Sequence, residues 1–272
     1  MTKKGLTVLA LLLAALVQSD ARAADRTYTL CDPAQAKMCA SLVAAYQFQE
    51  VANSDRTSET GTAPFLEPSA VDVARFTYAT SGDCVPENLH CLNMSAGDYL
   101  YIPRSPSLGT SFTANLWMNF SATPNNGVDV LSTKDAGGNQ KGSRLYLSVS
   151  GSNITPKFEI KQAMTDTVTP VTASSSFTSG SWHLVTFGAY ATPTTSEPYQ
   201  VTLWMQIDAG TKATATATYP PQVFLGDFRL SAAVSNSRYG QFSMFAGTLS
   251  AGEVTWLRNS GIGRGYPFTA NP

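Results

Sequence analysis

The sequence predicts an all-β fold, a two-sheet antiparallel jelly-roll sandwich that ends in one short C-terminal helix. Apolar and polar residues alternate over several stretches of strand length, which places successive side chains on opposite faces of a sheet. Gly, Pro and polar turn formers separate these stretches, and no helical period appears before the C-terminus. Because neither composition nor repeats mark a boundary, we expect a single domain over residues 41–268.

The clearest alternation lies in the two stretches "SFTANLWMNF" and "YQVTLWMQI". In the first, apolar residues share one face, and Trp117 and Asn119 lie on the other. In the second, Trp204 and Gln206 take the corresponding polar face. Each strand therefore has one dry face for the core and one wetter face that carries a tryptophan.

Further strands and one long polar loop are predicted along the rest of the domain. The strands cover residues 41–50, 74–79, 97–103, three stretches within 128–162, 180–190, 199–210 and 240–250. We expect 180–190 and 199–210 to pair as a hairpin, and residues 51–69 to form the loop.

The helix-like stretch near the C-terminus has a recognisable start and stop. Ser250 can act as the N-cap, and Glu253 completes an S-x-x-E capping box. Val254 and Leu257 give the helix an apolar face, and Gly261 is positioned to end it. A short helix of this kind can cover one end or edge of a sheet.

Residues 1–23 have the order of a signal peptide. Two lysines precede an apolar run, and the small residues of an Ala-Arg-Ala triplet follow it. We expect cleavage after Ala23 or Ala24, and a protein that is secreted, periplasmic or at the cell surface. An uncleaved anchor or a buried N-terminal helix is the alternative. No later segment is long and apolar enough to span a membrane.

The four cysteines fit an oxidising compartment, where they could form two disulfides. An N-terminal extension at residues 24–40 contains Cys31 and Cys39, and Cys84 and Cys91 follow in the domain. Four cysteines allow three connectivities. We favour Cys31–Cys39 and Cys84–Cys91, because each pair brackets one turn-rich loop. A zinc site would need closer pairs and more histidine.

The end of the chain carries a family likeness. The stretch "GQFSMFAGTLS" followed by "AGEVTWLRNSGIGRGYPF" resembles the end of laminin-G-like jelly rolls of the concanavalin A-like lectin/glucanase superfamily. The matching residues are Leu249, Ser250, Glu253, Leu257, Asn259 and Gly261. Four earlier stretches also resemble the family's strands in the same order, so the resemblance covers most of the chain from about Leu42 onward. It implies two antiparallel sheets packed face to face, in a group that includes carbohydrate-binding modules, adhesion domains and glycan-cleaving enzymes.

Composition and motifs narrow the function. A net charge of -1 without a basic cluster excludes nucleic acid as an expected partner. The related glucanases present E-x-D-x-x-E or E-x-D-x-E along a strand, and neither spacing occurs in this sequence. We therefore favour a non-catalytic binding module for carbohydrate or an extracellular protein surface. A structural or adhesive component of an extracellular assembly is the second interpretation, and a glycan-active hydrolase or lyase the third.

The predicted ligand-binding residues are two tryptophans and two neighbouring amides. The rings of Trp117 and Trp204 could stack on a sugar, and Asn119 and Gln206 could hydrogen-bond its hydroxyl groups. Tyr190 is a further aromatic candidate. The alternative is that the tryptophans pack under loops or join a second small core, as buried aromatic residues commonly do.

The resemblance also implies one structural calcium ion, which many relatives hold with loop oxygens. The available hard ligands are Glu50, Asp55, Glu59 and Asp135. The final strand of relatives often begins with an acidic pair, and Gly240 and Gln241 stand there in this chain. A solvated acidic loop without an ion is therefore the alternative.

Overall fold

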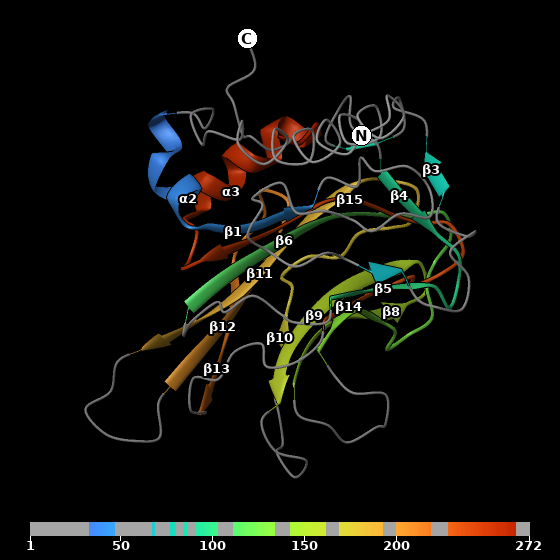
Figure 1. Cartoon of the computed structure of the whole chain (residues 1–272). Helices are drawn as coiled ribbons and strands as arrows, with labels where there is room; N and C mark the ends of the chain where they lie inside the picture. The colour runs from blue at the N-terminus through green and yellow to red at the C-terminus, as the bar shows by residue number, and fades with distance from the viewer. Residues whose placement is uncertain are drawn as a thin grey trace, which may run out of the picture.

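Two antiparallel sheets packed face to face form the protein, which confirms the predicted all-β sandwich (Figure 1). The computed structural model describes residues 33–46, 67–68, 77–79, 84–85, 91–102, 111–133, 142–161, 169–192, 200–218 and 228–264. The predicted signal peptide and the first part of the N-terminal extension lie outside these residues. None of the helices in the described part of the chain has the length and apolarity that a membrane span requires.

The large sheet contains eight of the described strands, in the order β13-β12-β11-β6-β15-β4-β3, with β1 paired to β15 beside β4. Its strands are β1 (Leu42–Tyr46), β3 (Thr77–Ala79), β4 (Cys91–Met94), β6 (Ser111–Phe120), β11 (His183–Thr192), β12 (Gln200–Ile207), β13 (Ala213–Thr218) and β15 (Ser237–Ala246). The predicted hairpin is confirmed, because β11 pairs antiparallel with β12.

The small sheet contains seven described strands, in the order β10-β9-β8-β7-β14-β5-β2. Its strands are β2 (Glu67–Pro68), β5 (Tyr99–Ile102), β7 (Asp129–Ser132), β8 (Gly142–Ser150), β9 (Asn153–Lys161), β10 (Val171–Thr172) and β14 (Phe228–Ser231). The three strands predicted within 128–162 are β7, β8 and β9.

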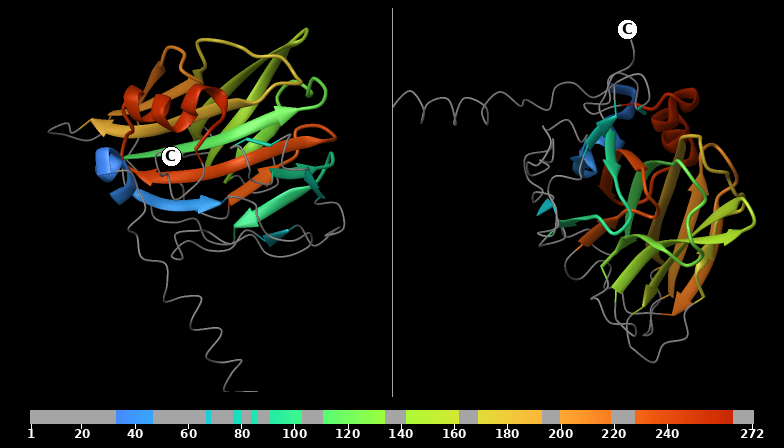
Figure 2. Two further views of the ribbon diagram at one scale, coloured as in Figure 1. Left: turned by 90° about the horizontal axis from the view of Figure 1, so that it is seen from above. Right: turned by 90° about the vertical axis from the view of Figure 1, so that its right-hand side faces the viewer.

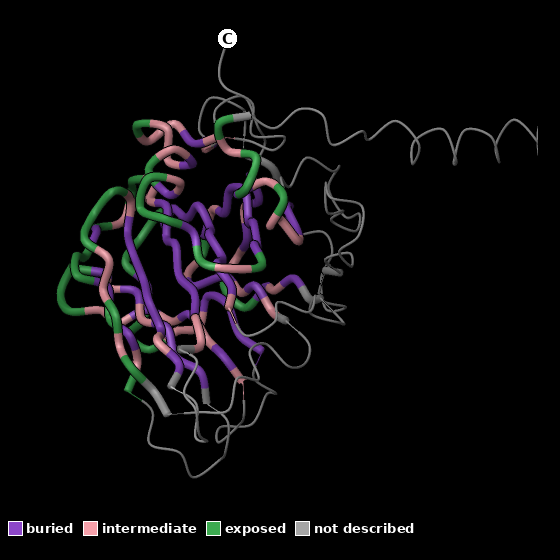
Figure 3. The backbone as a smooth tube through the Cα atoms, turned by 90° about the vertical axis from the view of Figure 1, so that its left-hand side faces the viewer, coloured by how far each residue is buried: buried purple, intermediate pink, exposed green. Residues whose placement is uncertain are grey.

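Alternating apolar side chains from both sheets form the core, and Figure 3 shows the central strands buried while the turns are exposed. Phe158 of β9 joins the sheets: its ring lies 4.8 Å from that of Phe187 and 6.1 Å from that of Phe112. Aromatic pairs at such distances add to the stabilisation from buried area. We call the face of each sheet that points away from this core its outer face.

The prediction missed β2, β4, β10, β13 and β14. β2 falls inside residues 51–69, which were predicted to form a loop, and the rest of that loop lies outside the described residues. The missed strands have only two to six residues each. A stretch of that length contains too few alternations to be recognised in a window. The error concerns only how many strands there are, since the architecture was predicted correctly.

Two helices cover the outer face of the large sheet, α2 (Ala36–Ala40) and α3 (Ala251–Arg258) (Figures 1 and 2). They enclose a second, smaller core between themselves and the strands. Its buried members are Met38, Trp117, Leu184, Phe245, Leu249, Val254 and Leu257. The sequence predicted α3, but it treated residues 33–40 as an irregular cysteine loop. That part is helical, with a 3-10 turn (Pro33–Gln35) leading into α2.

The predicted capping box of α3 is confirmed. Ser250 Oγ accepts a hydrogen bond from the Glu253 N–H at 3.2 Å, and the Ser250 N–H donates to Glu253 Oε2 at 2.7 Å. The predicted stop, Gly261, ends the 3-10 turn (Asn259–Gly261) that follows α3, and α3 itself ends three residues earlier. The helix ends at Arg258 because Asn259 takes a left-handed conformation (φ 46°), which Asn tolerates better than most residues.

We expect Ser250→Ala to lower the free energy of unfolding by about 0.5–2 kcal/mol, because it removes the N-cap acceptor. Glu253→Ala should cost less. Urea denaturation measures both, with Thr255→Ala on the exposed side of the same helix as the control. If Ser250→Ala changed the midpoint no more than Thr255→Ala does, α3 would not depend on its cap.

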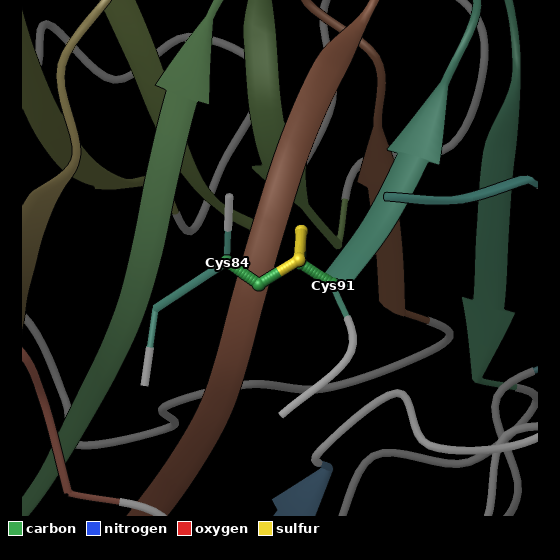
Figure 4. The surroundings of a disulfide bond; sticks show 2 residues. All are labelled: Cys84 and Cys91. Atoms are coloured by element: carbon green, nitrogen blue, oxygen red, sulfur yellow. A yellow bond between two sulfur atoms is a disulfide. The ribbon is translucent and has the colours of Figure 1, made fainter. Parts of the chain in front are cut away.

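One predicted disulfide is confirmed. Cys84 and Cys91 are bonded, with their Cα atoms 5.4 Å apart, and Figure 4 shows the bond at the start of β4. Cys39 is also disulfide-bonded, and its predicted partner, Cys31, lies outside the described residues.

Candidate functional site

The structure places Trp117 and Trp204 on the outer face of the large sheet, on strands that flank β11. Trp117 lies opposite Leu184 of β11, and Trp204 lies opposite Gly188. Four residues along a strand correspond to about 13 Å. The two indoles therefore do not face each other across one shared groove.

Both indoles are also buried, which agrees with the alternative that they are packing residues. Trp117 is 3% exposed and belongs to the small core beneath the helices, and Trp204 is fully buried. The Trp204 ring packs against Gly188, where an added Cβ would lie 2.9 Å from the indole Nε1. Lys212 Nζ lies 3.9 Å from the centre of the same ring. A ring without exposed surface cannot stack on a sugar.

The two predicted amide residues are buried as well, with Asn119 8% and Gln206 3% exposed. Gln206 Nε2 donates a hydrogen bond to the backbone oxygen of Asp208 at 3.1 Å. Tyr190 is half-buried, and Lys212 Nζ lies 5.9 Å from its ring centre. The predicted residues thus form a covered surface rather than an open site.

The predicted calcium ligands cannot be placed. Glu50, Asp55, Glu59 and Asp135 all lie outside the described residues. Within the described ranges, no group of three or more His, Cys, Asp or Glu side chains comes together to hold a metal ion.

A charged network joins the end of β12 to the end of α3. Asp208 Oδ2 lies 2.9 Å from His183 Nδ1, and Asp208 Oδ1 accepts from the Leu184 N–H at 3.0 Å. Arg258 Nε forms an ion pair with the same carboxylate at 3.4 Å. Burial alone would raise the pKa of Asp208, but these hydrogen bonds and charges outweigh it and hold the pKa below its usual value.

We expect Asp208→Asn to destabilise the protein by about 1–2 kcal/mol at pH 7, because it removes charge-assisted hydrogen bonds. Asn tolerates the positive φ of this position (52°). Since the native pKa is lowered, the charge contributes fully above the unfolded pKa of about 4 and is lost as the pH falls through the native pKa. Urea denaturation at pH 7 and pH 2.5 should show the difference shrinking at the lower pH. An equal difference at both pH values would exclude the charge as its source.

The outer face of the small sheet carries half-buried aromatic and charged side chains. Along β8, Leu145 and Leu147 point into the core, and Arg144 and Tyr146 point outward. The Arg144 guanidinium lies 4.1 Å from the centre of the Tyr146 ring. The alternation in "SRLYLSVS" was a signal for this pair, and the sequence prediction did not use it.

Arg144 is held between two carboxylates from neighbouring strands. Its Nε donates to Glu159 Oε1 at 2.6 Å, and its Nη1 donates to Asp129 Oδ1 at 3.3 Å. Burial would lower the pKa of Arg144, but the carboxylates outweigh it and raise the pKa. The Arg144 and Asp129 side chains remain 25% and 34% exposed. The result is a fixed array of donors and acceptors beside a tyrosine ring.

A second arginine–tyrosine pair lies on the same face. The Arg229 guanidinium of β14 lies 4.3 Å from the centre of the Tyr99 ring, and both side chains are half-buried. Ser132 of β7 is opposite Arg229 on one side and opposite Arg144 on the other. The two arginines are therefore two strands apart, about 10 Å at the usual strand spacing. We call Tyr99, Asp129, Arg144, Tyr146, Lys157, Glu159 and Arg229 the small-sheet platform.

No protein-family profile matches the sequence, and no curated protein matches it either. Solved structures do match the fold. One is domain 4 of AbnA, an extracellular GH43 arabinanase from Geobacillus stearothermophilus, in complex with arabinotriose. The TM-score is 0.57 at 13% identity, over 79% of this chain and 97% of that domain.

Two larger proteins contain a similar part. The binding domain of botulinum neurotoxin serotype D has a TM-score of 0.56 at 11% identity, over 83% of this chain and 53% of that one. A mutant sialidase of Trypanosoma rangeli with trans-sialidase activity has a TM-score of 0.53 at 11% identity, over 93% and 40%. The chain thus spans about half of the neurotoxin domain and less of the sialidase. These identities show a shared β-sandwich fold alone, and the laminin-G-like resemblance stays a prediction.

Proposed function

We propose that this protein is a non-catalytic carbohydrate-binding module whose site is the small-sheet platform. The observation that carries the proposal is the half-buried tyrosine Tyr146 beside an arginine that is itself fixed by two carboxylates. Sugar sites combine a ring for stacking with a few polar groups held in fixed positions. Pre-organised groups lose little conformational entropy when a ligand binds.

The charges of the platform support binding rather than hydrolysis. Glycosidases of the common type need one protonated carboxyl group as the general acid and one ionised partner. Glu159 and Asp129 both form ion pairs with the Arg144 guanidinium, so they are not a free pair of carboxyl groups placed on either side of one bond. Their oxygen atoms can still accept hydrogen bonds from sugar hydroxyl groups.

The fold and the disulfide support the proposal more generally. A similar domain belongs to an arabinanase that was solved with arabinotriose, and disulfides persist in oxidising compartments outside the cytoplasm. We therefore extend the proposal to a protein that acts outside the cytoplasm, as its N-terminal sequence predicts.

A glycan array, read in calcium and in chelator, tests the function and the predicted calcium ion together. For a glycan that binds, calorimetry of Tyr146→Ala should show about a tenfold loss of affinity, close to 1.4 kcal/mol. Tyr190→Ala is the matched control, because it removes a half-buried tyrosine from the outer face of the other sheet. Loss of binding in Tyr190→Ala alone would place the site on the large sheet. An array without any binding would favour the structural or adhesive interpretation.

A further inference from the structure

The two arginine–tyrosine pairs of the small-sheet platform differ in charge. Arg144 is neutralised by two carboxylates, Glu159 and Asp129. Among the side chains that the structure describes, none with a carboxylate forms an ion pair with the Arg229 guanidinium, which lies over the ring of Tyr99. Arg229 is nevertheless half-buried. A partly desolvated cation without a counter-charge is unfavourable, and an anion from outside the chain would relieve that cost.

Lys157 extends the excess of positive charge across the face. It lies opposite Tyr146 on β9 and is half-buried, without an ion pair to any described residue. The platform therefore holds three cations, Arg144, Lys157 and Arg229, against the two anions of Asp129 and Glu159. The net charge of these five groups is therefore +1. Both carboxylates form ion pairs with Arg144, so the excess positive charge lies on Lys157 and Arg229.

We infer that the platform binds an acidic saccharide, a sugar chain with uronic-acid carboxylates, and that Arg229 receives one carboxylate. This inference rests on the proposed function and names its ligand class. The planar guanidinium fork matches a carboxylate with two parallel hydrogen bonds. The Arg229 guanidinium carbon lies 4.3 Å from the centre of the Tyr99 ring, so an aromatic surface lies beside the carboxylate that it would bind.

The same charges set the direction of the ligand. A carboxylate placed at the Arg144 end would meet Glu159 and Asp129, and like charges at short range repel. At the Arg229 end a carboxylate meets a guanidinium without an ion pair, and Glu67 of β2 lies two strands away, opposite Tyr101. The acidic group therefore lies over β14 and β5 at Arg229, and the neighbouring sugar lies toward Tyr146 and its hydrogen-bonding groups.

Calorimetry with trigalacturonic acid and its fully methyl-esterified form tests the inference, because the two probes share their rings and differ in charge. We expect the acid to bind at least tenfold more tightly at low salt, and Arg229→Gln to remove about tenfold to a hundredfold of that affinity. The ester should bind wild type and Arg229→Gln equally. Arg264→Gln is the matched control, since Arg264 stacks on Trp256 at 4.4 Å, away from the platform, and should change neither probe.

Each other outcome overturns a specific step. If the acid and the ester bound with equal affinity, or if Arg229→Gln bound the acid as tightly as wild type, the inference of an acidic ligand would be overturned. The proposed carbohydrate binding would still stand. If an oligosaccharide with sulfate groups and no carboxylates bound as tightly as trigalacturonic acid, the choice of a carboxylate would be overturned. If neither these probes nor any glycan of the array bound, the proposed function would fail together with the inference.

Discussion

Gly240→Ala is expected to lower the free energy of unfolding by about 3 kcal/mol or more, at the upper end of what overpacking costs. An added Cβ at this position of β15 would overlap the carbonyl oxygen of Val85 and lie 2.9 Å from Cβ of Trp117. Neither neighbour can move away easily. Val85 follows Cys84, which is bonded to Cys91, and Trp117 is enclosed in the small core.

Thermal and urea unfolding measure the effect, with Gly252→Ala as the matched control. The Cβ of that variant would meet nothing closer than Ser250 Oγ at 3.9 Å, and Ala has the better helix propensity, so its stability should be equal or slightly higher. A double-mutant cycle with Cys84→Ser and Cys91→Ser identifies the cause. If the disulfide holds the Val85 backbone against Gly240, the cost of Gly240→Ala shrinks when the bond is absent. Simple additivity would contradict that explanation.

The sequence predicted the long strands well for a physical reason. In β6, one face meets the core and the other meets a polar or helix-covered surface, so the side-chain period of two is visible over ten residues. The capping box at Ser250 was equally visible, because it depends on two residues of one turn. The short helix α2 has five residues and contains no such local pattern.

The candidate site was predicted less well, because it depends on contacts between distant segments. Alternation correctly assigned Trp117 to the outer face of its strand. It could not show that Met38 and Leu257, from opposite ends of the described chain, cover that face. Arg144 and Tyr146 could have been found from their alternation along β8. The position of Arg229, next to Tyr99 but far from it in sequence, follows only from the pairing of β14 with β5.

Trp117→Ala is expected to cost about 3–5 kcal/mol, as for other large side chains removed from a packed interior. The indole is 3% exposed and contributes to the small core that also contains Leu184, Phe245 and Leu257. Its removal would leave a cavity between β6 and α3 that the fixed strands cannot close. Amide hydrogen exchange should therefore show faster opening of α3 together with a lower unfolding midpoint.

Trp256→Ala provides the matched control, because it removes the same side chain from α3 itself, where the indole is half-buried under Arg264. It should cost clearly less, since solvent already reaches that site and little cavity remains. The comparison also decides between the two interpretations of Trp117. If Trp117 has a structural role, the Trp117→Ala variant is less stable than wild type, but its folded fraction binds glycan with unchanged affinity. If the variant instead unfolded at the wild-type midpoint and lost glycan binding, Trp117 would be a ligand-binding residue and the site would lie beneath α3. Burial in a closed apolar cluster favours the first result, because a sugar could reach the indole only after the helix had separated from the sheet.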